Sequence, residues 1–329
     1  MSDTKYWDDY YEYWDRFVKE WFEQRKAGYT IPQDKISKVY KNAVSGLEFD
    51  ELPTPYLGNP RDGVDAVIIN LNPGLSEIIR FGEFLGENSD KTQYFSNRGN
   101  PLGWLIDEFE NKAKGEYSKF IGIDSEINWS CLNPGLLKYP RWVCGVDWWQ
   151  GYDGKLIVKG LDGQRHANQR MPWIRRMYGR NICPSKVFSL ELCPYHSKKF
   201  KIDNKQIDYL DVILPFIKEW AIDPAVNAVA KWRLPFAVAV GSDVAKVLMD
   251  IGADCEKEWS NKKPIDVWPK KKDGRLKERK YRLYTVESSC GQKARILVTQ
   301  ARPATSSPRE EDFKDVERVI LKYIKDNPL

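Results

Sequence analysis

Histidine is the scarcest chemically versatile residue of this 329-residue chain, which contains only His166 and His196. Two histidines leave little room for catalysis by histidine acids and bases. The six cysteines form no Cys-x-x-Cys pair, so neither a zinc site nor an iron–sulfur cluster is expected. We therefore expect no metal and no cofactor, and the reduced thiols of an intracellular protein.

Long hydrophobic runs, internal repeats and low-complexity tracts are also missing. No apolar stretch reaches the roughly 18 residues that span a bilayer, and the first residues show no apolar segment behind a basic start. We therefore expect a cytoplasmic protein, a monomer without a membrane partner. The chain also lacks Gly-x-Gly-x-x-Gly and Gly-x-x-x-x-Gly-Lys-Ser/Thr, which argues against dinucleotide binding and against P-loop phosphate binding.

Positive charge is concentrated although the net charge is only +5. Residues 261–280 carry nine Lys/Arg, among them Lys270, Lys271 and Lys272, and three Asp/Glu, a local +6 that leaves −1 for the rest. Residues 165–180 hold five arginines, including Arg175 and Arg176, and no acid. Basic segments interleaved with aromatics are typical of proteins that bind DNA, double- or single-stranded, and solvated loops are the alternative.

The hydrophobic pattern predicts an α/β fold. Buried strands of a parallel sheet are expected at 66–71, 186–192, 235–240 and 294–299. Helical patterns occur at 101–114, 206–220, 242–252 and 310–325, with Ser242 as the expected N-cap of the third. A further strand is expected at 279–287. We expect three α/β/α layers around a short, mainly parallel central sheet, with ligands at the carboxyl ends of its strands.

Two regions stand outside this alternation. Residues 4–25 form an amphipathic helical pattern whose aromatic stripe predicts docking on the body, with a partner interface as the alternative. We assign 1–60 to an N-terminal helical extension packed on the body and 61–329 to the α/β domain. The Trp-rich segment 116–164 lacks helical periodicity and is expected to be an insertion.

Three short motifs follow predicted strands. The first strand leads into Asn72-Pro73-Gly74, a stiff turn with a neutral amide that can orient a water. The second ends at Glu191, followed by Leu-Cys-Pro, and a carboxylate there needs a partner or a function. An ion pair with a nearby arginine is the structural alternative. The last strand leads into Arg302 and a Ser/Thr/Pro loop suited to phosphate contacts or to a helix cap.

Together these motifs resemble the uracil-DNA glycosylase superfamily over residues 60–310, most closely its mismatch-specific and single-strand-selective branches. Asn72-Pro73-Gly74 matches the motif after the first strand of that family, and Glu191-Leu192-Cys193-Pro194 is similar to an Asn-x-Cys-Pro strand end. The family's final His-Pro-Ser-Pro loop is matched by Arg302 onward. The N-terminal extension and the insertion have no counterpart in the resemblance.

The resemblance implies an enzyme that flips a base and hydrolyses its bond to deoxyribose. Asn72 would position the water, Pro73 would shape the base pocket, and Arg302 would stand where the family has its motif histidine. The DNA backbone would be held by Thr305, Ser306 and Ser307. The aromatic that stacks on the flipped base would be Phe81 or Phe95, with Phe84 and Tyr94 as further candidates.

The residue that would read the base departs from the family, because Glu191 replaces an Asn. An ionised carboxylate only accepts hydrogen bonds, so it repels the O4 of uracil and accepts from the N4 amino group of cytosine. Since every genome contains cytosine, we expect a modified cytosine, hydroxymethylated or glycosylated as in phage DNA. Such an activity would serve DNA repair or defence against phages. The alternatives are a uracil-DNA glycosylase, an inactive DNA-binding protein with this fold, and a nucleotide-processing α/β enzyme.

Overall fold

In the computed structural model, the residues described are 3–26, 29, 33–44, 46–49, 55–57, 60, 63–71, 174–180, 182, 186–197, 208–260, 274, 280–299 and 314–329. The expected helix 101–114 and the insertion 116–164 lie outside these residues. Of the basic stretch 261–280, only Gly274 and Lys280 lie within them.

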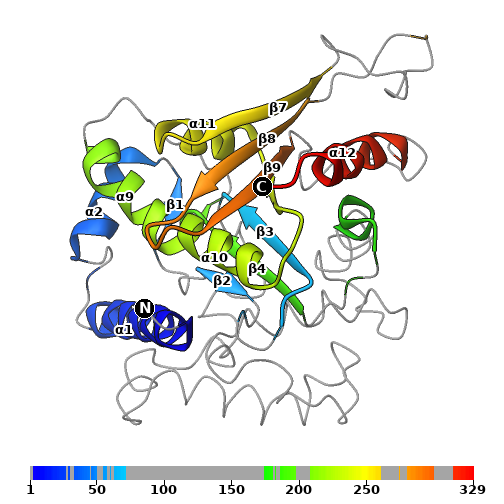
Figure 1. The fold of residues 1–329 in the computed structure, drawn as a ribbon. Helices are drawn as coiled ribbons and strands as arrows, with labels where there is room; N and C mark the ends of the chain where they lie inside the picture. The colour runs from blue at the N-terminus through cyan, green and yellow to red at the C-terminus, as the bar shows by residue number, and fades with distance from the viewer. Residues whose placement is uncertain are drawn as a thin grey trace, which may run out of the picture.

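A seven-stranded sheet forms the middle of the molecule, in the order β2-β4-β3-β6-β9-β8-β7 (Figure 1). Its strands are β2 (Tyr56–Leu57), β3 (Ala66–Asn70), β4 (Val187–Glu191), β6 (Ala237–Val240), β7 (Asp254–Ser260), β8 (Lys280–Glu287) and β9 (Lys293–Thr299). The neighbours β4, β3, β6 and β9 are parallel, whereas β2, β8 and β7 each pair antiparallel. A separate ribbon joins β1 (Leu47–Glu48) to β5 (His196–Ser197). The predicted α/β fold is confirmed.

All five predicted strands are present, and their burial explains why they could be recognised. Every residue of β3 and β6 is buried, as expected for central parallel strands covered on both faces. The edge strand β7 was not predicted because its sequence DCEKEWS mixes charged and apolar residues and is largely exposed in its first half. Charged side chains on such an edge discourage pairing with another chain.

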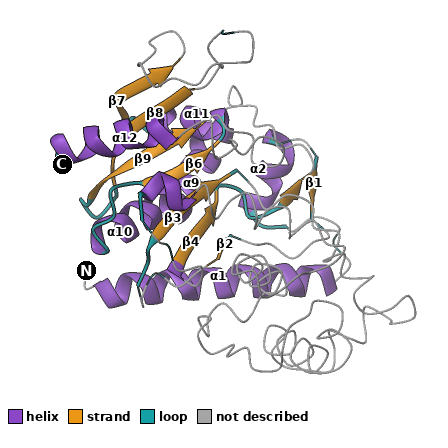
Figure 2. Cartoon of the chain, turned by 90° about the vertical axis from the view of Figure 1, so that its right-hand side faces the viewer, coloured by secondary structure: helices purple, strands orange, loops and turns teal. Residues whose placement is uncertain are grey.

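Helices cover both faces of the sheet and make the outer layers (Figure 2). One face carries α1 (Asp3–Lys26), α2 (Lys35–Ala43), a long helix from 209 to 231, and α11 (Ser242–Asp250). The other face carries the helical residues 174–178 and α12 (Lys314–Asp326). Among the described helices, none is long and apolar enough to cross a membrane.

The long helix continues past the predicted end at residue 220 and contains two prolines. It consists of η6 (Tyr209–Ile213), α9 (Leu214–Ile217), η7 (Lys218–Ile222) and α10 (Asp223–Lys231), with α-helical backbone angles at each junction. Pro215 and Pro224 each follow a π-helical turn. Proline lacks the N–H of an α-helical hydrogen bond and clashes with the preceding turn, and a wider π turn removes both problems. The helix therefore passes two residues that normally end one.

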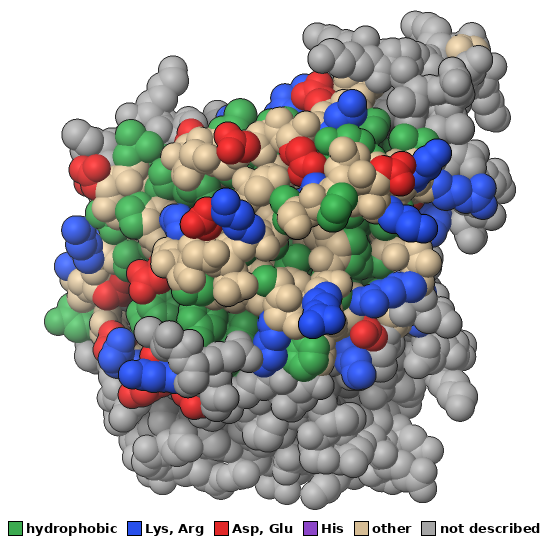
Figure 3. All heavy atoms as spheres, in the orientation of Figure 1, with side chains coloured by type: hydrophobic (Ala, Val, Ile, Leu, Met, Phe, Trp, Pro, Cys, Tyr) green, Lys and Arg blue, Asp and Glu red, His purple; other side chains and the backbone are tan. Residues whose placement is uncertain are grey.

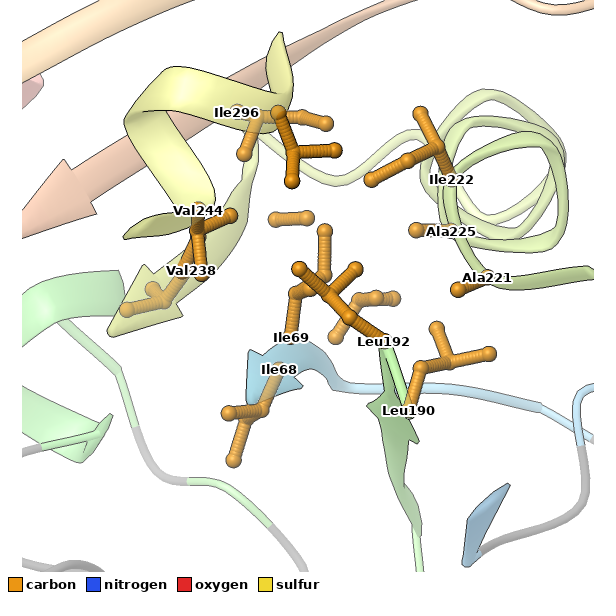
Figure 4. Packing of buried hydrophobic residues seen from close by; sticks show 14 of the residues in the cluster. Ile68, Ile69, Leu190, Leu192, Ala221, Ile222, Ala225, Val238, Val244 and Ile296 are labelled. Carbon is orange, nitrogen blue, oxygen red and sulfur yellow. The ribbon is translucent and has the colours of Figure 1, made fainter. Parts of the chain in front are cut away.

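The core between the sheet and this helix is built from branched residues on the strands and small residues on the helix. Ile69 and Leu190 point toward Ile222 and Ala225, whereas Ile68 points to the opposite face (Figure 4). All five residues are at most 2% exposed. Alanine on the helix lets its backbone approach the sheet closely, so the strands are held against a rigid support.

The aromatic stripe of α1 is part of this core. Trp7, Tyr10, Trp14 and Phe17 are all buried. The rings of Trp7 and Tyr10 meet Phe188 of β4 edge-on, with centroids 6.0 and 6.5 Å apart. The stripe therefore faces the body, as the spacing predicts, and is not left as an open partner surface.

The hydroxyl of Tyr178 joins the first half of β3 to Phe236, the residue directly before β6. Its oxygen accepts from the backbone N–H of Val67 at 3.0 Å and lies 3.0 and 2.8 Å from the carbonyl oxygens of Val67 and Phe236, to which it can donate. Burial raises the pKa of this phenol, so it stays a neutral donor and acceptor. The hydroxyl therefore provides hydrogen bonds to backbone groups that are buried away from solvent.

We predict that Tyr178→Phe lowers the free energy of unfolding by about 1–3 kcal/mol, because these buried backbone groups lose a hydrogen-bond partner. Chemical denaturation of purified protein measures the change. Tyr29→Phe, at an exposed tyrosine, is the matched control and should stay within about 0.5 kcal/mol of wild type. Equal losses in the two variants would contradict the role given to the Tyr178 hydroxyl.

Candidate functional site

Five strands of the sheet end at the same edge, which we call the carboxyl edge. β3, β4, β6 and β9 are parallel, and β7 runs the same way because β8 is antiparallel to both of its neighbours. From β3 the chain returns to β4 past residues 174–178 on one face, whereas β6 leads into α11 on the other. The connections diverge between β3 and β6, and in open α/β sheets ligands bind at such a switch point.

Asn70 and Glu191 are brought together at this edge by strand register. They are paired residues of β3 and β4, and Ser189 precedes Glu191 by two on the same face of β4. The Nδ2 of Asn70 donates to the Oγ of Ser189 at 2.9 Å and to Oε1 of Glu191 at 3.2 Å. Asn70 is only 6% exposed, while Glu191 is half-buried. We call these two residues the Asn70–Glu191 pair.

The backbone around the Asn70–Glu191 pair stays hydrogen-bonded beyond the regular strands. Leu192 N donates to the carbonyl of Asn70, and Cys193 N to that of Leu71, both at 3.0 Å. On the other side, Glu191 N donates to the Pro55 carbonyl at 2.9 Å. The backbone at Glu191 is therefore held from both sides, which fixes the position of its Cα atom.

Helix α2 supports the chain that follows β4. Tyr40 donates its hydroxyl to the Leu192 carbonyl at 2.7 Å. The hydroxyls of Tyr195 and Ser37 are hydrogen-bonded, and Ser37 is bonded in turn to Asp34, the N-cap of α2. These contacts tie the N-terminal extension to the segment directly after Glu191.

Burial also decides the chemistry of the groups beside Glu191. It raises the pKa of the Cys193 thiol and of the Tyr195 phenol well above their usual values. Both groups are neutral at physiological pH. Since the thiolate is the reactive form of cysteine, Cys193 is a packing residue and not a nucleophile.

The switch point also contains the start of α11. The N-cap of the helix is Gly241, with φ 111°, and Ser242 is the first residue of the helix. The expected N-cap is thus wrong by one residue. Gly241 N donates to the Thr299 carbonyl at 2.9 Å, and a Cβ at Gly241 would lie 3.4 Å from Leu71 Cδ1. Glycine is needed here for its backbone angle, and it also permits close approach of the chain after β3.

The described part of the first basic segment is anchored to the protein itself. Arg175 donates from Nε and Nη2 to the Ile182 carbonyl, at 3.3 and 3.1 Å. Arg180 donates to the carbonyl of Asp65, which precedes β3 at the edge opposite Glu191. Arg176 is half-buried. Arg180 therefore anchors this segment to the chain that enters β3, whereas Arg175 joins the helical residues 174–178 to Ile182.

The second basic segment begins and ends at the carboxyl edge. Ser260, the last residue of β7, is paired with Lys280, the first residue of β8. Lys280 Nζ lies 2.9 Å from Glu258 Oε2, and Arg282 Nε lies 2.8 Å from the same oxygen. Partial burial opposes the charge of Glu258, yet its hydrogen bonds to Arg282 and Lys280 lower its pKa. In the face shown in Figure 3, acidic and basic side chains are interspersed over the described surface.

Most of the site residues suggested by the sequence lie outside the described residues. They are Asn72, Pro73, Phe81, Phe95, Lys270, Lys271, Lys272, Arg302, Thr305, Ser306 and Ser307. Glu191 is described and is the last residue of β4, at the carboxyl edge. Sequence reasoning missed Asn70 and Ser189. Their signal was a polar residue ending an apolar run and a second polar residue two positions before Glu191.

Comparison of the chain with protein-family models finds no match, and comparisons with characterised proteins and with solved structures find no significant match either. Within the part of the chain that the structure describes, no group of three or more His, Cys, Asp or Glu side chains is arranged to hold a metal ion. The Asn70–Glu191 pair is the described group of polar side chains that lies at the carboxyl edge where a ligand is expected.

We predict that Gly241→Ala lowers the free energy of unfolding by about 1–3 kcal/mol, because alanine strains at this backbone angle. Thermal or chemical denaturation measures it. Ser242→Ala, at the next residue, should change stability by less than about 0.5 kcal/mol because Ser242 is exposed and is not the N-cap. A larger loss in Ser242→Ala than in Gly241→Ala would reverse the assignment of the cap.

Proposed function

We propose that this chain is a monofunctional DNA N-glycosylase that flips a modified cytosine out of DNA and hydrolyses its bond to deoxyribose. The observation that carries the proposal is the Asn70–Glu191 pair, on β3 and β4, beside the switch point between β3 and β6. It puts a hydrogen-bonded carboxylate where ligands bind in this architecture. In the sequence, Asn72 follows Asn70 by two residues, so at most about 7 Å of chain separates their Cα atoms.

In this proposal Glu191 reads the flipped base. An ionised carboxylate is an acceptor only, and cytosine offers an amino group at N4 where uracil offers the acceptor O4. Uracil would bring two acceptors together inside a partly desolvated site. Mismatched hydrogen bonding in a built polar site costs several orders of magnitude in rate, so Glu191 favours cytosine derivatives. A substituent at C5 then separates the substrate from ordinary cytosine.

The chemical step is hydrolysis with a water as the nucleophile. Asn72 orients the water, whose oxygen attacks C1′ while the bond from C1′ to the base breaks. The departing base carries the bonding electrons, and the guanidinium of Arg302 stabilises that negative charge as a permanent donor. The attacking water releases one proton to solvent, so the sugar keeps a hydroxyl, and the departing base takes up one proton from solvent. Phe81 or Phe95 stacks on the flipped base.

Phosphate contacts come from loops that leave the same edge. Thr305, Ser306 and Ser307 follow β9, and the basic stretch that contains Lys270–Lys272 connects β7 to β8. Five strand spacings separate β4 from β7, about 24 Å. This is the length of about seven base pairs of duplex. A duplex lying along the edge would therefore meet both the base-reading pair and the ends of the basic stretch.

We predict that the protein forms abasic sites in duplexes that contain hydroxymethylated or glycosylated cytosine, and not in duplexes that contain uracil. Alkaline cleavage of end-labelled DNA measures the product. Glu191→Gln, which replaces an oxygen by an amide donor, should lower activity on the cytosine derivative and raise activity on uracil. Asn72→Ala should lose at least about 100-fold in turnover while DNA binding is retained.

Two outcomes would contradict the proposed activity. Cleavage of uracil DNA with no action on any cytosine derivative would make the chain a uracil-DNA glycosylase. Binding to DNA without abasic sites, unchanged in Asn72→Ala, would make it a binding protein. Glu191→Asp, which keeps the carboxylate on a shorter stem, is the control and should retain the preference for cytosine derivatives at a reduced rate.

We predict that replacing Lys270, Lys271 and Lys272 by Gln makes DNA binding less dependent on salt. For every phosphate that is no longer neutralised by a lysine, the slope of log K against log salt should fall by about 0.9. Fluorescence anisotropy from 50 to 200 mM salt measures it. The matched control replaces Lys186, Lys231 and Lys293, which lie at the opposite edge of the sheet, by Gln. Equal effects in the two triple variants would remove the carboxyl edge as the DNA surface.

A further inference from the structure

The hydrolysis proposed above gives no task to Asn70, yet this side chain is more than nine-tenths buried at the centre of the site. A buried amide is costly unless its groups are hydrogen-bonded. Its Nδ2 meets the Oγ of Ser189 at 2.9 Å and Oε1 of Glu191 at 3.2 Å. The amide nitrogen carries two hydrogens, and these contacts use one each.

The chemistry of the carboxylate fixes the orientation of this amide. An ionised carboxylate can only accept, so the nitrogen of Asn70, and not its oxygen, must face Glu191. Ser189 then also acts as an acceptor toward the amide. Because Asn70 is paired in register with Glu191, any slip of β3 against β4 would break both contacts at once. The orientation of the carboxylate is thus built into the sheet.

We propose that Asn70 is a positioning residue that fixes Glu191 as a hydrogen-bond acceptor and thereby sets the preference of the site for bases that carry an amino donor. The inference rests on the proposed function and makes it more specific. A donor beside a carboxylate favours its charged form. Without the amide, the carboxyl group could rotate or hold a proton, and a protonated carboxyl donates to the O4 of uracil as well as it accepts from cytosine.

Discrimination therefore belongs to the pair and not to Glu191 alone. Asn70→Leu removes the donor and keeps a branched side chain with the same number of heavy atoms. Asn70→Asp places a second carboxylate beside the first, and two adjacent carboxyl groups share a proton, which creates the donor that the native site lacks. The two variants should differ in a defined way: the first weakens the preference for cytosine, and the second turns it toward uracil.

The test measures binding and does not need turnover. Duplexes carry either a 5-hydroxymethylcytosine or a uracil nucleotide with a fluorine at the 2′-arabino position, which blocks hydrolysis by destabilising the cationic transition state. Titration gives the dissociation constant of each duplex. The measured quantity is the constant for the uracil duplex divided by the constant for the 5-hydroxymethylcytosine duplex, and it is above one when cytosine is preferred. We expect that ratio to fall about tenfold or more in Asn70→Leu, since a hydrogen bond to a charged group is removed, and to invert in Asn70→Asp. Binding to a duplex with a tetrahydrofuran abasic analogue should stay unchanged.

The matched control is Asn227→Leu, the same substitution at another buried asparagine. Asn227 accepts from Ser288 Oγ at 2.9 Å and from Cys290 Sγ at 3.1 Å, at the hairpin between β8 and β9 on the opposite edge. This variant should lose stability and keep the ratio. If the Asn70 variants do not fold, Asn70→Ser is combined with Glu191→Gln in a double-mutant cycle. Coupling between the two changes supports the inference, and additive effects overturn it.

The inference and the proposed function fail in different experiments. Wild-type ratios in Asn70→Leu and Asn70→Asp overturn the role of Asn70 even if abasic sites form. So does a wild-type protein that binds the two analogue duplexes equally. Absence of abasic sites in hydrolysable DNA overturns the enzyme, whereas a binding ratio that depends on Asn70 would still establish the pair as the reader of the base.

Discussion

The in-register parallel pairing of β3 with β4 is the constraint on which the rest of the site depends. It places Asn70 opposite Glu191 and leaves Ser189 on the same face, so that one amide bridges two side chains of the neighbouring strand. A carboxylate next to a hydrophobic core is tolerable only with such partners. Side chains of a strand alternate between its two faces. A shift of β3 by one residue would therefore place Asn70 on the face of the sheet that the long helix covers.

The surrounding structure keeps this arrangement rigid. Aromatic side chains of α1 pack on β4, and α2 holds the chain after Glu191 through Tyr40 and Ser37. Below the sheet, the long helix passes two prolines without ending, so its packing face stays continuous. A binding group needs this kind of support, since a carboxylate that moves by one ångström selects ligands poorly. The N-terminal extension thus helps to hold the strand end that carries Glu191 in place.

The sequence predicts the parts of this fold whose physics is local. Fully buried strands show as apolar runs, and the stripe of α1 shows as aromatic spacing. β7 could not be predicted, because this edge strand keeps charged residues and shows no apolar run. The continuation of the long helix past Pro224 could not be predicted either, because proline normally ends a helix and here a π turn accommodates it. Glu191 was identified as an unusual charge at a strand end. Asn70 was not, because its partner lies 121 residues away and only the register of β3 and β4 joins them.

The layout of charge suggests how affinity and selectivity are separated in the proposed enzyme. Glu191 is negative and would by itself repel DNA, so a base-reading carboxylate has to be combined with positive charge elsewhere. The basic stretch starts from β7, about 24 Å along the same edge, beyond the Debye length of about 8 Å at physiological salt. The carboxylate of Glu191 and the positive charge of the basic stretch therefore interact weakly with each other. Salt should weaken phosphate contacts while the choice between bases, made inside the half-buried pair, changes little.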